Sequence, residues 1–233
     1  MPSGGSDNKG LHAYFPRMRR IWLPLLAASV WTAACQRPSA QPVHPPEPPE
    51  HALANLAAQH IVVLPTYTAH AAAGLTWTIP TVAELRRTMD ADILSAFDER
   101  GLRKAWIFPE QLQSAYRRNP TYASDPYGLA EEPLRSPGLA IDQRLPEPLA
   151  SQIRTMVAFH EDARLVLAPV ELVLEPVSGA TGGGRGTLRL VLMDARLSNV
   201  RWIGTVSGDA SASFGPVITA SVAAKLAGVV APQ

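Results

Sequence analysis

The sequence has only one cysteine, Cys35, among its 233 residues. A single cysteine excludes an intramolecular disulfide. Cys35 also precedes the region that has the composition of a folded domain. That region therefore has no cysteine nucleophile and no thiolate metal ligand. An excess of positive charge is missing too, because 21 Lys and Arg residues oppose 20 Asp and Glu residues.

The small net charge of +1 is unevenly distributed along the chain. Residues 1–34 contain four basic residues and one acidic residue, which leaves 17 basic and 19 acidic residues, or −2, for the remainder. A nucleic-acid-binding domain needs basic residues to neutralise phosphates. We therefore expect the remainder to bind no nucleic acid. The whole chain is 46% hydrophobic, which is enough for one domain with a substantial core.

Familiar catalytic and metal-binding motifs are also missing from the sequence. It contains no Gly-x-Ser-x-Gly elbow and no His-Glu-x-x-His pair. The glycine cluster at 179–186 lacks the lysine and the following helix of a phosphate-binding loop, so a flexible hairpin loop is expected there. Glu131 and Glu132 are adjacent and do not face one another as an acid–base pair unless the fold arranges it. We predict no catalytic residue, metal or cofactor.

The first 34 residues have the organisation of an export signal. Arg17, Arg19 and Arg20 precede an uncharged, mainly apolar stretch at residues 21–34. Fourteen helical residues span about 21 Å, which is short of the ~30 Å hydrocarbon core of a bilayer. A buried core helix is the alternative, and the arginines before it and the prolines after it disfavour that interpretation. Translation starting at Met18 would give a compact signal peptide.

The end of this signal resembles the lipobox of bacterial lipoproteins, in which small residues precede a lipidated cysteine. Ala33, Ala34 and Cys35 match the pattern, whereas Thr32 stands where leucine is usual. Because of that departure, cleavage by ordinary signal peptidase without lipidation is the alternative. By the resemblance, Cys35 carries diacylglycerol and anchors the protein to a membrane. Gln36 instead of aspartate then implies the outer membrane, with the domain facing the periplasm.

The segment after the cysteine is rich in proline. Residues 36–50 contain six prolines, which fix φ and remove hydrogen-bond donors. Residues 35–58 are therefore predicted to be the lipidated cysteine and an extended tether, reaching up to about 45 Å. Plain disorder is the alternative. Residues 59–233 are predicted to form a single globular domain.

The start of this domain has clear signals for secondary structure. Residues 61–64 are a β-branched run, Ile-Val-Val-Leu, that predicts a buried strand. Thr81 and Glu84 form a capping-box pattern at the start of a helix, and Gly101 is a candidate for its C-terminal cap. The apolar residues between them recur every four positions and predict a buried face of Leu85, Met89, Ile93 and Phe97.

Later segments complete an α/β pattern. We expect a strand at 105–108, a helix from Pro109, a helix at 148–160 and a long strand at 163–174, in which Pro169 requires an edge or a bulge. Strands at 187–194 and 200–207 form a hairpin before a C-terminal helix. The prediction is an α/β fold with a mixed sheet of about five strands and three to four helices in two or three layers.

A proline-rich insert at about 119–147 interrupts this pattern. A long aperiodic loop in a compact domain is usually functional or disordered. Tyr116, Tyr122 and Tyr127 cluster around its start, and exposed tyrosines suit a protein interface. They are candidates for a partner surface. The alternative is that they pack the insert onto its own domain.

The domain also resembles the periplasmic domain shared by CsgG, the amino-terminal domain of TolB, and LpoB. The likeness covers roughly residues 59–228. It is carried by the strand and proline at 61–65, the helix closing on Gly101, the helix and valine-rich strand at 149–170, and a hairpin with Asp194 and Trp202-Ile203-Gly204. The family's usual glycine after the third strand is replaced around Ala168-Pro169. The resemblance implies a fold and an envelope setting.

Together these features predict a membrane-anchored, non-enzymatic envelope lipoprotein that binds a protein partner or assists assembly. An exported hydrolase with an unrecognised active site remains the alternative.

Overall fold

The computed structural model describes residues 53–160, 163–177 and 183–231. In these residues a six-stranded mixed sheet is built around a long central strand, β4 (Leu165–Pro176). The parallel strands β1 (Ile61–Val63) and β2 (Thr68–Ala71) pair with one edge of β4, and β3 (Trp106–Ile107) pairs with β1. The antiparallel strands β5 (Gly184–Asp194) and β6 (Asn199–Ser207) complete the other side.

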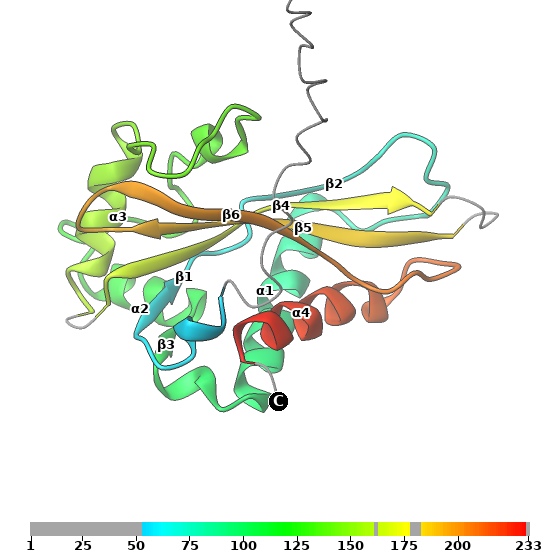
Figure 1. The fold of residues 1–233 in the computed structure, drawn as a ribbon, viewed down its shortest axis with the longest axis horizontal. Coiled ribbons are helices and arrows are strands. Elements are labelled where there is room, and N and C mark those ends of the chain that lie inside the picture. The colour runs from blue at the N-terminus through cyan, green and yellow to red at the C-terminus, as the bar shows by residue number, and fades with distance from the viewer. Residues whose placement is uncertain (1–52, 161–162, 178–182, 232–233) are drawn as a thin grey trace, which may run out of the picture. The chain divides into compact units, whose positions relative to one another are not determined.

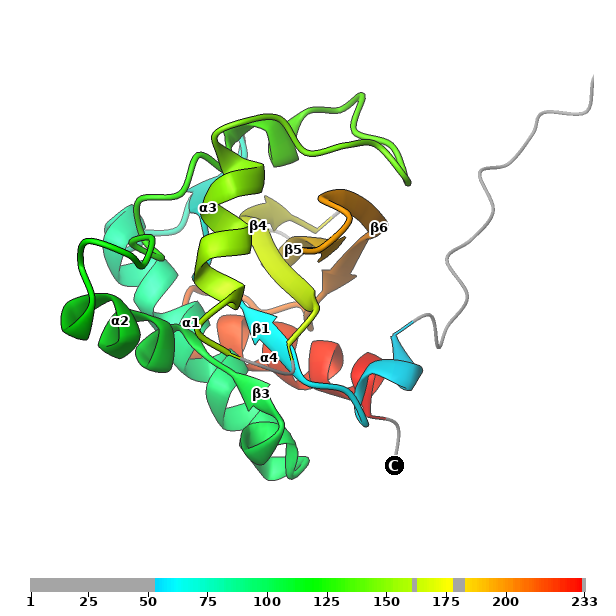
Figure 2. The same ribbon diagram turned by 90° about the vertical axis from the view of Figure 1, so that its left-hand side faces the viewer.

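Four α-helices cover the sheet on both faces. They are α1 (Val82–Glu99), α2 (Pro109–Arg118), α3 (Leu149–Val157) and α4 (Pro216–Val230). In Figure 1, α1 and α4 lie below the sheet and α3 lies at its left-hand end; Figure 2 is viewed from that end, with α3 in front of β4 and β5. The predicted α/β class, mixed sheet and final hairpin with a C-terminal helix are confirmed, and the arrangement has three layers.

Each face of the sheet has its own hydrophobic core, because the central strands are buried on both sides. Leu188, Leu190 and Leu192 of β5 pack with α1 and α4, whereas Val191 and Met193 pack with α3 and the insert. The core between the sheet and α1 also contains the whole predicted helix face: Leu85, Met89, Ile93 and Phe97.

Pro169 produces a bulge in β4, as the sequence predicts, although β4 is not an edge strand. The pairing register shifts between Pro169 and Glu171. On the other side of β4, the bulge lies opposite the gap between β1 and β2, where the Tyr67 N–H donates to the Pro169 carbonyl at 2.9 Å. Proline has no N–H to give to a ladder, so it is accommodated where regular pairing is already interrupted.

The ends of α1 and the start of α2 follow the local sequence signals. Thr81 and Glu84 form a reciprocal capping box at the start of α1. Gly101 follows α1 with φ of +73°, a left-handed conformation that favours glycine. Pro109 occupies the first turn of α2, where its missing N–H costs nothing.

The insert is packed against the sheet face covered by α3. Leu129, Leu134 and Leu145 are buried in that core, and Leu134 belongs to the short 3-10 helix η3 (Glu132–Arg135). The insert also extends the start of β6, since Asp142 and Gln143 exchange backbone hydrogen bonds with Val200 at 2.7 and 2.9 Å. Both ends of the segment are therefore attached to the domain.

Candidate functional site

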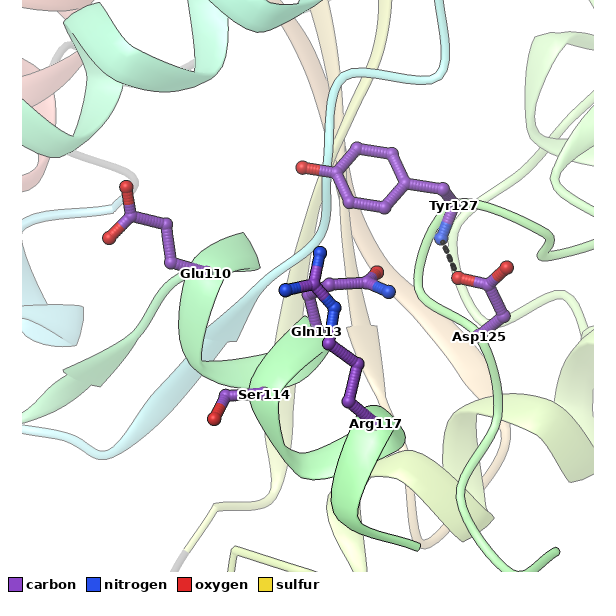
Figure 3. Close-up of a pocket in the computed structure, with 6 residues that line it drawn as sticks. All are labelled: Glu110, Gln113, Ser114, Arg117, Asp125 and Tyr127. Carbon is purple, nitrogen blue, oxygen red and sulfur yellow. Dashed lines mark hydrogen bonds between the residues drawn. The ribbon is translucent and has the colours of Figure 1, made fainter. Parts of the chain in front are cut away.

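The insert, α1 and α2 meet at a group of surface hollows. The largest has a volume of about 530 Å³ and lies between α2 and the insert (Figure 3). Polar side chains dominate its lining. Asp125 fixes the start of the insert's loop by accepting a hydrogen bond from the Tyr127 N–H at 3.0 Å. The lining residues are Glu110, Gln113, Ser114, Arg117, Asp125 and Tyr127.

Tyr127 also borders two neighbouring hollows on the α1 side. One, of about 220 Å³, is lined by residues of α1 and α2 that include Arg87, Asp90 and Phe108. The other is lined by Ala83, Arg86 and Arg87 together with Tyr127. Tyr127 is 46% exposed and lines each of the three hollows, so it lies on the rim that they share. We call this surface, formed by α1, α2 and residues 125–127, the Tyr127 surface.

The three tyrosines singled out in the sequence have different environments. Tyr127 lines the hollows, whereas Tyr116 and Tyr122 line none of those described above. Tyr116 is half-buried on α2, and Tyr122 is 74% exposed. The structure therefore assigns one of the three to the concave surface.

Beside this surface, an aspartate of α1 is held by the connection between β1 and β2. The Thr66 N–H and the Thr66 hydroxyl each donate to Asp90 Oδ1 at 2.7 Å, and Arg86 Nε donates to the Thr66 carbonyl at 2.5 Å. Asp90 Oδ2 is buried without a hydrogen-bond partner among the described residues. Burial raises the pKa of Asp90 to about 6, although Thr66 and Arg86 act in the opposite direction.

Glu131 of the insert lies near Asp90 and is buried, with 2% of its surface exposed. Its Oε2 has no hydrogen-bond partner in the described part of the chain. Burial raises the pKa of Glu131 to about 8; the Arg86 charge lowers the pKa and the Asp90 charge raises it. Because Glu131 and Glu132 are adjacent, the sequence did not predict that they act as a pair. In the fold, Glu131 lies near Asp90 of α1.

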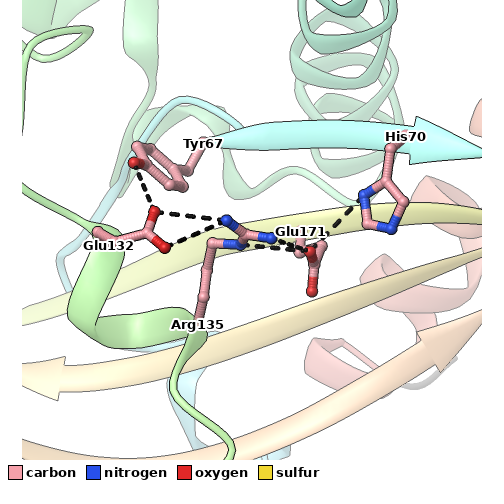
Figure 4. A network of polar contacts seen from close by, with 5 residues as sticks. All are labelled: Tyr67, His70, Glu132, Arg135 and Glu171. Atoms are coloured by element: carbon pink, nitrogen blue, oxygen red, sulfur yellow. Dashed lines mark hydrogen bonds and ion pairs between the residues drawn. The ribbon is translucent and has the colours of Figure 1, made fainter.

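A second polar network attaches η3 to the sheet (Figure 4). Arg135 binds Glu171 of β4 at 2.9 Å and Glu132 at 3.3 Å. The network extends to both sides, since Tyr67 donates to Glu132 at 3.0 Å and His70 Nδ1 lies 3.6 Å from Glu171. Arg135 thus connects the insert with β4 and, through its partners, with β2.

No sequence motif predicted a role for Arg86, Asp90 or Glu131 at this surface. Asp90 belongs to α1. It follows the buried Met89 directly and is four residues from Arg86, so both lie along one edge of the apolar stripe of α1. Polar residues at such an edge are the only local signal, because the partner Glu131 is 41 positions later in an aperiodic segment.

The chemistry available at the Tyr127 surface is limited. No histidine or cysteine lines the three hollows. Within residues 53–160, 163–177 and 183–231, no group of three or more metal-binding side chains is placed to hold a metal ion. No helix in that part of the chain is long and apolar enough to cross a membrane. Cys35 and the cleavage motif Thr32, Ala33 and Ala34 lie outside the described residues.

Comparison with known proteins gives no family assignment. No family model matches the sequence, and no curated protein matches it. A structure of the PelC dodecamer from Paraburkholderia phytofirmans is 14% identical over 76% of this chain and 91% of that chain, with a TM-score of 0.35. A point variant of the same dodecamer is 13% identical over 74% and 89%, with a TM-score of 0.34. These scores are too low to support an argument about fold or function.

Proposed function

We propose that this chain is an exported lipoprotein, anchored through Cys35, whose domain binds a protein partner in the cell envelope as an interaction or assembly factor. We place it at the outer membrane, facing the periplasm, on the strength of the lipobox-like sequence and Gln36. The likeness to the CsgG, TolB and LpoB domains supports the same setting. The partner contact is proposed to lie on the Tyr127 surface.

The observation that carries the partner contact is the position of Tyr127. Its half-exposed ring lies on the shared rim of three hollows, with arginines and carboxylates around it. Aromatic and arginine side chains in concave surfaces dominate the binding energy of protein interfaces. The lining is polar, which suits an interface that also exists exposed to water.

One feature favours the alternative of an exported hydrolase. Asp90 lines a hollow, and its pKa of about 6 is in the range of a general acid or base. Its Oδ1 is already engaged by two donors from Thr66, and no histidine or cysteine lines the hollow with it. Partner binding is therefore the function that the geometry supports better.

The anchor is tested by replacing its cysteine. We expect the native chain to fractionate with membranes and to carry the mass of a lipid, and Cys35→Ala to lose both. Thr32→Leu, which completes the usual pattern, is the matched variant and should process at least as efficiently. Equal solubility of the native chain and Cys35→Ala, with no lipid on either, would show that the protein is not a lipoprotein.

The partner surface is tested by substituting tyrosines. We expect Tyr127→Ala to weaken binding of a cross-linked and purified partner by at least about tenfold, or about 1.4 kcal/mol, which is more than most interface residues lose on truncation. Tyr122→Ala is the control, because that side chain is exposed and lines none of the three hollows, and it should change affinity by less than about twofold. Titration by calorimetry measures both.

A photo-crosslinking amino acid supplies an independent readout. Placed at position 127 it should give one discrete product, whereas at Leu197, an exposed residue of the turn between β5 and β6, it should give none. Equal affinities of Tyr127→Ala and the native chain, with crosslinking at 197 alone, would refute the assignment of this surface.

A further inference from the structure

The acidic pair near the Tyr127 surface comes from two parts of the fold that are far apart in sequence. Asp90 belongs to α1, and Glu131 belongs to the insert immediately before η3. Glu131 is flanked by Leu129 and Leu134, which are 6% and 0% exposed. A charge on Glu131 would therefore be poorly hydrated, since the residue is 2% exposed, and no ion pair joins its carboxylate to a basic group of the described residues.

Hydrogen bonding distinguishes the two carboxyls. Asp90 accepts two hydrogen bonds from Thr66, which stabilise its ionised form. Glu131 Oε2 receives none from the described residues. One positive charge, that of Arg86, faces both groups. The cluster is neutral when Arg86 and Asp90 are charged and Glu131 holds a proton. Ionisation of Glu131 adds a second negative charge near Asp90.

Arg87 lines one hollow together with Asp90, and two tyrosines are also coupled to the pair. Tyr67, from the connection between β1 and β2, is the further titratable group coupled to Glu131, and burial and Glu132 raise its pKa. Tyr127 faces Asp90 from the insert itself, and burial and Asp90 raise its pKa. Both are neutral at physiological pH. On the side of α3, the residue bonded to the segment is the uncharged Gln152, whose Oε1 accepts the Ala130 N–H at 3.0 Å.

We propose that Glu131 is a proton-dependent latch, which holds residues 125–135 against α1 when protonated and releases them when ionised. The Tyr127 surface includes the start of this segment, so proton binding controls whether that surface is assembled. The functional consequence rests on the proposed partner-binding role. The latch itself does not, because it concerns only the attachment of the insert.

The direction of the pH effect follows from linkage. A carboxyl with a raised pKa binds its proton more tightly in the closed state than in the open state, so opening releases a proton. The closed pKa of about 8 and the ordinary value of 4.5 define the window. Within it, the opening equilibrium constant increases by up to about tenfold per pH unit, and it levels off above pH 8. Low pH therefore closes the latch.

Hydrogen exchange of the full-length protein measures this opening. After correction for the intrinsic exchange rate, we expect amides in residues 125–135 to lose at least about tenfold in protection between pH 6 and pH 8. Glu131→Gln keeps the shape of the neutral side chain and should abolish this dependence. Glu132→Gln is the matched neighbour: it weakens the contact with Arg135 at every pH and should retain the slope.

Two outcomes would overturn the latch. One is a native slope below about threefold, and the other is an unchanged slope in Glu131→Gln. If that variant does not fold, carboxyl NMR titration of the native protein decides, since a Glu131 midpoint below pH 6 excludes the latch. Failure of partner binding in Tyr127→Ala leaves the exchange result unaffected, so the two proposals fail separately.

Discussion

Phe97→Ala is expected to destabilise the domain by about 3–5 kcal/mol, the usual cost of removing a buried aromatic ring. Phe97 is fully buried on α1 and packs against two aromatic rings. Its centroid lies 4.9 Å from that of Trp106 on β3 and 6.0 Å from that of Phe108. The cavity would open where α1 meets the short strand β3, and the flanking rings cannot both collapse into it. Because domains of this size are stable by about 5–15 kcal/mol, this is a large fraction of the total.

Equilibrium denaturation in urea measures this loss. Phe159→Ala is the matched control, because that ring is 39% exposed beyond the end of α3, and it should cost less than about 1 kcal/mol. Phe97→Leu keeps most of the volume and should lie between the two. A loss below about 1.5 kcal/mol for Phe97→Ala would show that the aromatic contact does not anchor α1.

Local signals were sufficient for most of this core. The four-residue spacing of Leu85, Met89, Ile93 and Phe97 predicts the buried face of α1, and Thr81 and Gly101 define its ends. Alternation in β5 identifies the leucines that face α1 and α4. These elements are predictable because each one contains its own period and its own boundary residues.

β2 was not predicted, because Thr-Ala-His-Ala has neither an apolar run nor aromatic residues. Among the described strands it pairs with β4, and it continues in the direction of β1 along the same edge of β4, past the bulge at Pro169. The start of β5 was also missed. Gly184 and Gly186 were expected in a loop, but they pair with Pro176 and Leu174 in the sheet.

Gly186 has a packing reason for its place in β5. A Cβ there would lie 3.1 Å from Val222 and 3.2 Å from Ile218, so the glycine lets α4 approach the sheet closely.

The candidate site was less predictable than the core, because it also depends on contacts between segments that are distant in the sequence. Glu131 meets α1 only through the path of the insert, and an aperiodic segment gives no signal of which side chain turns inward. What the sequence did indicate is that tyrosines gather there, and one of them borders the hollows.

Asp194→Ala is expected to cost about 3 kcal/mol, because one buried carboxylate serves both the sheet and the following turn. Its Oδ2 accepts from Arg164 Nε at 2.7 Å and from a second guanidinium nitrogen at 2.6 Å. Its Oδ1 accepts the N–H groups of Arg196 and Leu197, each at 2.9 Å, at the start of the turn into β6. Asp194→Asn keeps an acceptor for the turn but loses the charge, so we expect about half the cost.

The stability that Asp194 contributes is lost as pH falls, whereas the Glu131 latch opens as pH rises. Burial alone would raise the pKa of Asp194, but Arg164 and the N–H groups of Leu197 and Arg196 outweigh it and lower the pKa. A lowered pKa gives stability that is present above the unfolded value of about 3.9 and is lost as pH falls below it. The stability difference between the native protein and Asp194→Ala should therefore be constant from pH 5 to pH 8 and shrink below about pH 4. Asp98→Ala, which removes an exposed pair with Arg103, should cost about 0.5 kcal/mol or less, and an equal cost for both variants would contradict the role of Asp194.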